Sequence, residues 1–257
     1  MRTSLAVFLF AALAAFVGPS RCALAEPITV PSGLHPGDQY RLAFVTSTTR
    51  DATSSDIADY NNFVTADANS VPALAALGTT WTAIASTPST DARDNTSTNP
   101  LIDAVGVPIF TLANTLVAPT NSSLWSGNII SPILSDEQGS VDRLYGVWTG
   151  TSPDGTGLAT LGGPYETQGG IPLATDTTSG YTGPDWMSFF ADPQQAAQSL
   201  YAISGVLTVP EPSSVVLAFL AVAGLAVPSL RRRRYCRPVV PAQALTGNTP
   251  PCYGRTQ

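Results

Sequence analysis

Acidic side chains carry most of the chemistry that this sequence offers. From Glu26 to Val209 there are seventeen Asp or Glu residues, four arginines, no lysine and a single histidine, His35. Two carboxylates at a suitable separation can act as general acid and base in glycoside hydrolysis. Asp136 and Glu137 are adjacent in sequence, and on a strand their side chains would point to opposite faces. This pair therefore does not predict an acid/base site.

Other forms of catalysis lack the residues they need. A nucleophilic triad requires a base, and the one imidazole stands in a turn-rich segment, with no serine elbow in the sequence. The sequence also contains no phosphate-binding loop and no dinucleotide fingerprint. We therefore expect a protein that is not an enzyme, with a secreted glycan-active hydrolase as the alternative.

The long loop before residue 184 contains the oxygen ligands that a calcium ion would use. Asp154, Asp176 and Asp185 lie in or next to this Gly-, Thr- and Pro-rich stretch. Their spacing follows no known calcium-binding pattern, and solvated acidic loops explain them equally simply. We expect no resident metal or cofactor, with calcium as the alternative.

Tryptophan side chains are the second group suited to binding, because aromatic faces stack on sugar rings. Trp125, Trp148 and Trp186 lie in the middle and late parts of the chain. We expect Trp148 in the core and Trp186 to be the most exposed of the three. Asp185 and Trp186 are therefore the predicted ligand contacts.

Charge and cysteine content restrict the partners of this region. Four arginines against seventeen acidic residues give the stretch from Glu26 to Val209 a net charge of −13. Nucleic acid and anionic lipid would be repelled by such a surface. The three cysteines, Cys22, Cys236 and Cys252, all lie outside this stretch, so no disulfide can hold it together. Its length suits one domain with a real core.

The first residues have the three parts of a secretory signal peptide. Arg2 is followed by an apolar segment, residues 5–17, and then by Ala23-Leu24-Ala25. Cleavage between Ala25 and Glu26 would make Glu26 the new N-terminus. The competing interpretation is a buried N-terminal helix.

The C-terminal fifth has three consecutive parts. Pro210, Glu211 and Pro212 precede 18 uncharged residues, 213–230, and then Arg231, Arg232, Arg233 and Arg234. A helix of that length reaches ~27 Å, about the thickness of a bilayer core. The arginines would remain cytoplasmic, which places the preceding residues outside. A buried helix of a soluble domain and a permanent, unprocessed anchor are the alternatives.

This order and spacing resemble the PEP-CTERM sorting signal of bacteria, whose carriers are substrates of membrane transpeptidases called exosortases. The resemblance implies that Pro210, Glu211 and Pro212 are recognised by such an enzyme, and that the four arginines act as a stop-transfer signal. It also implies an association with exopolysaccharide at the cell surface. Family members usually end shortly after the basic cluster, whereas 23 residues, Tyr235–Gln257, follow here. We predict that this extension is disordered.

The elements that would position any site alternate between strands and helices. Tyr40, Leu42 and Phe44 predict a core strand over residues 40–45. A helix capped by Ser54 or Ser55 should follow, and a second, through residues 74–77, should end at Gly78. Residues 81–85 and 108–112 predict two further strands.

The second half should hold two more strands around a long loop. Residues 144–151, which include Trp148, predict a central strand that ends in a turn at 152–155. Residues 200–209 predict one final strand. Its residues Tyr201, Ile203, Leu207 and Val209 should share a face.

This order is similar to the C-type-lectin-like fold, in which a Trp-x-Gly sequence marks a central core strand. Trp148 and Gly150 match that pattern, whereas the family's Trp-Asn-Asp calcium signature and its disulfides are absent. The resemblance implies an α+β domain with short helices and mixed strands. An all-β sandwich or jelly roll is the alternative.

The expected organisation has four parts: a signal peptide (1–25), an exported globular domain (26–208), a sorting and transmembrane segment (209–234) and a tail (235–257). We expect a cell-surface or extracellular-matrix protein, membrane-anchored or released, with a non-catalytic glycan-binding domain. A passive structural coat protein is a further alternative. The expected partners are an exosortase-type transpeptidase, the membrane and exopolysaccharide, and not nucleic acid.

Overall fold

Strand β1 (Gln39–Val45) runs through the middle of the domain and is buried along almost its whole length. The computed structural model describes residues 27–141, 146–171 and 181–211. Alternate side chains of β1 enter two different hydrophobic clusters: Tyr40, Leu42 and Phe44 lie in one, and Ala43 and Val45 in the other. The predicted core strand is confirmed, and it contributes to a core on each face of the sheet.

Strand β8 (Ser199–Ser204) is the antiparallel neighbour of β1, and all six of its residues are buried. Its side chains alternate as those of β1 do, so that Leu200 and Ala202 join the first cluster while Tyr201 and Ile203 join the second. The other edge of β8 pairs with two short strands. A strand buried on both faces and paired on both edges holds the sheet together.

The remaining strands complete one mixed sheet of nine strands, in the order β4-β3-β1-β8-β5-β6-β7, with β2 also paired to β8 and β9 to β1. The pairs β1·β3 and β5·β8 are parallel, and the others are antiparallel. The further strands are β2 (Trp81–Ala83), β3 (Ile109–Thr111), β4 (Leu116–Ala118), β5 (Val147–Trp148), β6 (Thr167–Gly170), β7 (Phe190–Asp192) and β9 (Leu207–Thr208).

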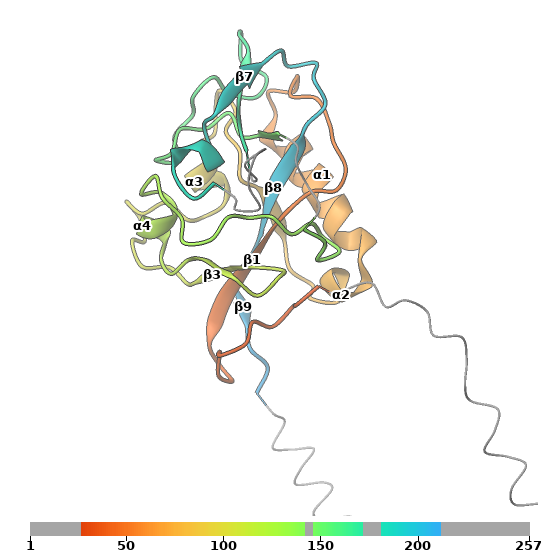
Figure 1. Ribbon diagram of the computed structural model, residues 1–257, viewed down its shortest axis with the longest axis vertical. Helices are drawn as coiled ribbons and strands as arrows, with labels where there is room; N and C mark the ends of the chain where they lie inside the picture. The colour runs from red at the N-terminus through yellow and green to blue at the C-terminus, as the bar shows by residue number, and fades with distance from the viewer. Residues whose placement is uncertain (1–26, 142–145, 172–180, 212–257) are drawn as a thin grey trace, which may run out of the picture. The chain divides into compact units, whose positions relative to one another are not determined.

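Helices cover both faces of this sheet. Helices α1 (Ile57–Ser70) and α2 (Pro72–Ala75) contribute to the first cluster, whereas α3 (Ala92–Asn95) and α4 (Asn121–Leu124) contribute to the second. Figure 1 shows the two pairs on opposite sides of β1 and β8. A 3-10 helix, η1 (Pro184–Trp186), also packs against the second cluster. The described part of the chain is therefore an α+β domain.

The start of α1 differs from the prediction by one or two residues. The N-cap is Asp56, not Ser54 or Ser55, because the Asp56 side chain accepts a hydrogen bond from the backbone N–H of Ala58. The Ser54 hydroxyl instead donates to the carboxylate of Asp59 in the first turn. Aspartate and serine are similarly good caps, so spacing alone could not separate them.

The predicted final strand is divided in two. Ala43 pairs with Ile203, but Tyr40 pairs with Leu207, so the chain gains one residue between β8 and β9. Because side chains alternate along a strand, one extra residue transfers the later side chains to the other face. Leu207 and Val209 accordingly lie in the first cluster with Leu42, not with Tyr201 and Ile203 as predicted.

Three other predicted elements are shorter or interrupted. Residues 81–85 form a strand only as far as Ala83, and β5 comprises only Val147 and Trp148 of the predicted 144–151, of which 144–145 lie outside the described residues. The predicted loop before residue 184 contains β6, which pairs with β5. Its glycines gave no hydrophobic alternation from which a strand could be predicted.

A buried arginine joins β1 to the loop after α3. The guanidinium of Arg41 donates to the carbonyl oxygens of Thr96 (2.9 Å), Ser204 (3.0 Å) and Ser97 (3.4 Å). Burial lowers the pKa of Arg41, because a charge is costly away from water. The carbonyl oxygens supply part of the missing solvation, and in return the loop is fixed against the sheet.

Gly150 is required by both backbone conformation and space. Its φ is +58°, and a Cβ at this position would lie 2.5 Å from Leu161 Cδ1 and 2.7 Å from the backbone oxygen of Ser86. Trp148, two residues earlier, is fully buried, so the predicted core position of the Trp-x-Gly sequence is confirmed.

We predict that Gly150→Ala lowers the free energy of unfolding by roughly 2–4 kcal/mol, the sum of left-handed strain and overpacking. Gly78→Ala is the matched control, because Gly78 has the same φ of +58° and a Cβ there would have no atom within 4 Å. The control should lose only about 1 kcal/mol. Denaturant unfolding of the full chain measures both, and equal losses would show that the close packing around Gly150 has no energetic weight.

Candidate functional site

An open groove lies where two loops meet at the β6–β7 edge of the sheet. β6 begins at Thr167 and β7 ends at Asp192, and these two residues are paired, so the loop before β6 lies beside the loop after β7. The groove encloses about 400 Å³. We call it the Tyr165 groove; it is lined by Gly163, Pro164, Tyr165, Glu166, Pro193, Gln194 and Gln195.

Hydrogen bonds hold both walls of the Tyr165 groove. The side-chain amide of Gln194 donates to the carbonyl oxygens of Gly163 and Tyr165, which ties one wall to the other. Ala52, which is fully buried, donates its N–H to the Gln194 carbonyl and accepts from Gly162 N–H, both at 2.7 Å. One core residue therefore anchors both loops.

The lining of the groove suits a polar ring. Tyr165 is 79% exposed, so its aromatic face is open to solvent. Glu166 and Gln195 are also exposed beside it. An exposed aromatic ring stacks on the apolar face of a sugar, while carboxylate and amide groups bond its hydroxyls. This combination of groups is able to bind a saccharide.

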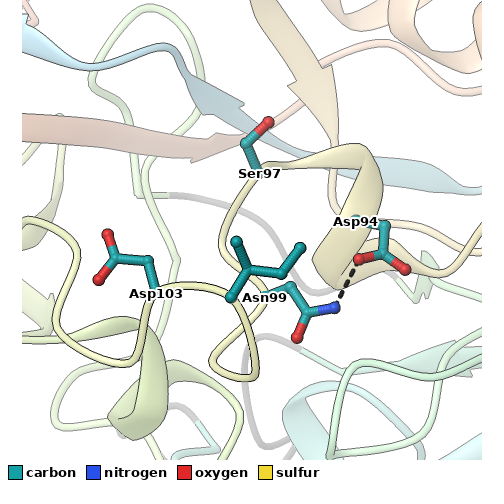
Figure 2. A pocket seen from close by; sticks show the side chains of 5 residues that line it. Asp94, Ser97, Asn99 and Asp103 are labelled. Carbon is teal, nitrogen blue, oxygen red and sulfur yellow. Dashed lines mark hydrogen bonds between the residues drawn. The ribbon is translucent and has the colours of Figure 1, made fainter.

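A second hollow lies beside α3 and the loop that follows it. It encloses about 250 Å³ and is lined by Asp94, Ser97, Asn99, Ile102 and Asp103. Figure 2 shows the polar side chains around it, with the Asn99 amide donating to Asp94 at 2.6 Å. Asp103 accepts from two backbone N–H groups of its own loop, those of Val105 and Gly106. The carboxylates therefore brace their own loop, and no aromatic ring lines this hollow.

The predicted exposure of Trp186 is wrong. Its side chain is 1% exposed, and its ring packs against Tyr201 and Trp125, with ring centroids 5.6 Å and 6.5 Å away. The turn of η1 directs the ring into the second cluster, while Asp185 stays partly exposed. A buried indole offers no face to a sugar in this structure, so the predicted pair Asp185 and Trp186 does not form a stacking site.

The adjacent acids Asp136 and Glu137 are buried in a turn, not placed on a strand. Asp136 accepts from the backbone N–H groups of Gln138 and Ser140, and Glu137 accepts from Ser47 N–H at 2.8 Å. Both side chains are at most 3% exposed. Their oxygens bond backbone groups, which is a structural role.

The predicted calcium ligands are only partly described. Asp154 accepts from the N–H and the hydroxyl of Thr156; burial raises its pKa, but these bonds outweigh burial and hold the pKa below its usual value. Asp176 lies outside the described residues. Among the residues that the structure describes, no group of three or more His, Cys, Asp or Glu side chains is placed to hold a metal. The expectation of no resident metal, with calcium as its alternative, stays a prediction.

The predicted sorting motif closely follows the last strand that the structure describes. Val209 donates to the Asp38 carbonyl and accepts from Gly37 N–H, and it is the last of the described residues with such bonds; Pro210 and Glu211 are exposed. The contacts divide the chain into two units, Met1–Pro210 and Glu211–Gln257. Outside the described residues lie the other predicted signal residues: Ala25, Glu26, Pro212, Arg231, Arg232, Arg233 and Arg234.

The predicted transmembrane helix, residues 213–230, also lies outside the described residues. Among the helices that are described, none has the length and apolar character needed to cross a bilayer.

No family model matches this chain, and no curated protein is significantly similar to it.

The Tyr165 groove was not predicted from the sequence. Its residues come from two segments nearly thirty positions apart, which are brought together by tertiary contacts such as the pairing of β6 with β7. One available signal was Tyr165 itself, a large aromatic residue between Pro164 and Glu166, in a loop with few apolar neighbours. An aromatic residue that has few apolar neighbours in the sequence is a candidate for a contact at the protein surface.

The second cluster, which contains Trp186 and Tyr201, includes buried polar atoms that make no hydrogen bond to the described residues. Tyr201 Oη and Trp186 Nε1 find no hydrogen-bond partner among the described residues. Burial raises the pKa of Tyr201 well above its usual value. Tyr60 is a useful contrast: burial also raises its pKa, to about 12, but its hydroxyl donates to the Ser54 carbonyl at 2.7 Å.

We predict opposite effects of Tyr→Phe at these two positions. Tyr201→Phe removes an unpaired buried hydroxyl and should raise the free energy of unfolding by about 1 kcal/mol. Tyr60→Phe removes a hydrogen bond and should lower it by about 1 kcal/mol. Denaturant titration at neutral pH compares them, and a loss of stability in Tyr201→Phe equal to that in Tyr60→Phe would contradict the unpaired state of Tyr201.

Proposed function

We propose that this chain is an exported cell-surface or matrix protein, sorted through its C-terminal segment, whose domain binds a glycan without catalysing a reaction on it. The observation that carries the binding part is the Tyr165 groove, in which a 79% exposed aromatic ring stands beside a carboxylate and amides. The export part is supported by the sequence signals at the two ends of the chain.

The position of the sorting motif supports processing by a transpeptidase. An enzyme that recognises Pro210, Glu211 and Pro212 needs an extended, accessible chain. Among the described residues, the last backbone hydrogen bonds before the motif are those of Val209, and proline has no N–H with which to extend them. Exosortase-type processing would therefore cut close to the domain without unfolding it.

The groove also has a favourable location. β7, beside which the groove lies, and β9, which leads to Pro210, are at opposite ends of the domain in Figure 1. A domain tethered after Pro210 would hold its groove at the end farther from the tether. Exopolysaccharide outside the cell is a suitable ligand for that arrangement.

The finer fold proposal is a C-type-lectin-like domain. In support, α1 and α2 follow β1, Trp148 is buried in the short strand β5, and a long, largely irregular segment precedes the last strands. A sandwich of two sheets is less favoured, because the strands form one sheet covered by helices on both faces.

The rival functions differ from this proposal in chemistry. A glycosidase of the usual kind places two carboxylates around the scissile bond, whereas among the described residues Glu166 is the one carboxylate that lines the groove. A passive coat protein would need no exposed ring in a preformed groove. A glycan array followed by product analysis separates the three: binding without cleavage supports the proposal, shortened oligosaccharides support a hydrolase, and neither supports a coat protein.

We predict that the exported protein begins at Glu26 and ends near Pro210. Intact-mass analysis of the protein recovered from its native cell envelope measures both ends. A Glu211→Ala variant should retain the C-terminal segment, and Glu166→Gln serves as a matched acidic control that should be processed normally. Recovery of wild-type chains that end at Gln257 would contradict sorting and support a permanent anchor.

We predict that Tyr165→Ala weakens glycan binding by roughly tenfold, since a stacked aromatic contact contributes about 1 kcal/mol or more. Tyr165→Phe keeps the ring and should bind nearly as well as wild type. Phe189→Ala is an off-groove control that removes another exposed ring. Calorimetric titration with the best array ligand measures all three, and an unchanged affinity in Tyr165→Ala would exclude this groove as the binding site.

A further inference from the structure

We propose that the ligand of the Tyr165 groove is a saccharide with free amino groups, such as an oligomer of deacetylated hexosamine. This inference rests on the proposed glycan-binding function and specifies its ligand class. The inference is based on the hydrogen-bonding and charged groups of the groove that make no bond within the protein and are therefore free to contact a ligand.

The groove is rich in acceptors and poor in donors. Gln194 uses its side-chain NH₂ group on the carbonyl oxygens of Gly163 and Tyr165, so its remaining polar atom is the acceptor Oε1. Pro164 and Pro193 have no N–H at all. Two side-chain donors are left among the lining residues, the Gln195 amide and the Tyr165 hydroxyl, and both groups also accept hydrogen bonds.

Glu166 adds a charge without a partner. It is exposed, and within the described ranges its carboxylate makes no hydrogen bond or ion pair. An ionised carboxylate only accepts hydrogen bonds. The groove therefore presents a negative charge and acceptors, which complement a ligand that donates hydrogen bonds and carries a positive charge.

The arginines of the described residues are engaged elsewhere. Arg41 is buried against backbone carbonyls, Arg50 lies over the ring of Tyr60 at 4.2 Å, and Arg93 lies 3.8 Å from Asp91. None of them lines the groove. An anionic sugar, such as a uronate, would therefore meet repulsion from Glu166 without a compensating cation.

A protonated amine fits these requirements better than a hydroxyl or an acetamide. An ammonium group supplies three N–H donors, has no acceptor and carries a full charge. N-acetylation removes the charge and adds an acceptor. The ring of the sugar would stack on Tyr165, and its ammonium group would bond Glu166.

The test compares four oligosaccharides of equal length on the full chain, by calorimetric titration at about pH 6, where amines are protonated and Glu is ionised. They are built from glucosamine, N-acetylglucosamine, glucose and glucuronate. We expect the glucosamine oligomer to bind about fivefold more tightly than the N-acetylated and neutral ones, as for an exposed ion pair. The uronate should bind most weakly, and added salt should reduce the preference.

Three variants test which residue causes the preference for the glucosamine oligomer. Glu166→Gln should abolish the preference for the amine, so that the glucosamine and glucose oligomers bind equally tightly to this variant. Asp94→Asn, which removes a carboxylate in the second hollow, should keep the preference. Tyr165→Ala should weaken binding of all the oligomers.

The outcomes separate this inference from the function on which it rests. Equal or tighter binding of the N-acetylated, neutral or acidic oligomer, or a preference that survives in Glu166→Gln, overturns the inference but leaves glycan binding standing. Absence of binding to every oligomer, with an unaltered thermal midpoint, overturns both.

Discussion

The antiparallel pairing of β1 with β8 is the constraint on which the remainder of the domain depends. Both strands are buried on both faces along most of their length, so each apolar side chain of the pair belongs to one of two clusters, and a shift of one residue would exchange the contents of the clusters. β8 also pairs with β5, β5 with β6, and β6 with β7. The position of the Tyr165 groove at the end of β6 and β7 is thus fixed through this series of pairings.

Much of this central arrangement could be predicted from local patterns, and the rest could not. The alternation of Tyr40, Leu42 and Phe44 predicted β1, and Trp148 was correctly predicted in the core. Both predictions succeed because the burial of large apolar side chains follows from the hydrophobic pattern of a short stretch of sequence. The extra residue between β8 and β9 depends on pairing with β1, which is remote in sequence. Local alternation therefore placed Leu207 and Val209 on the wrong face.

The same distinction explains the candidate site. Trp186 was expected to contact a ligand because tryptophan often does, but the turn of η1 directs its ring into the core. Tyr165 is the opposite case. The sequence around it gives no sign of a strand edge, which is created by the pairing of β6 with β7. Tertiary contacts also decide which polar groups of the groove are free for a ligand. Only the structure shows that the Gln194 NH₂ group donates to carbonyl oxygens of the opposite wall.

The central claim is that a saccharide stacks on Tyr165 at this edge of the sheet, and NMR of the full chain with isotope-labelled tyrosine and tryptophan rings tests it most directly. On titration with the oligosaccharide that binds best, the ring signals of Tyr165, assigned through Tyr165→Phe, should shift and saturate with the ligand. Those of the buried Trp186 and Tyr201 should stay unchanged. Saturable binding that shifts Trp186 and leaves Tyr165 in place would contradict the account.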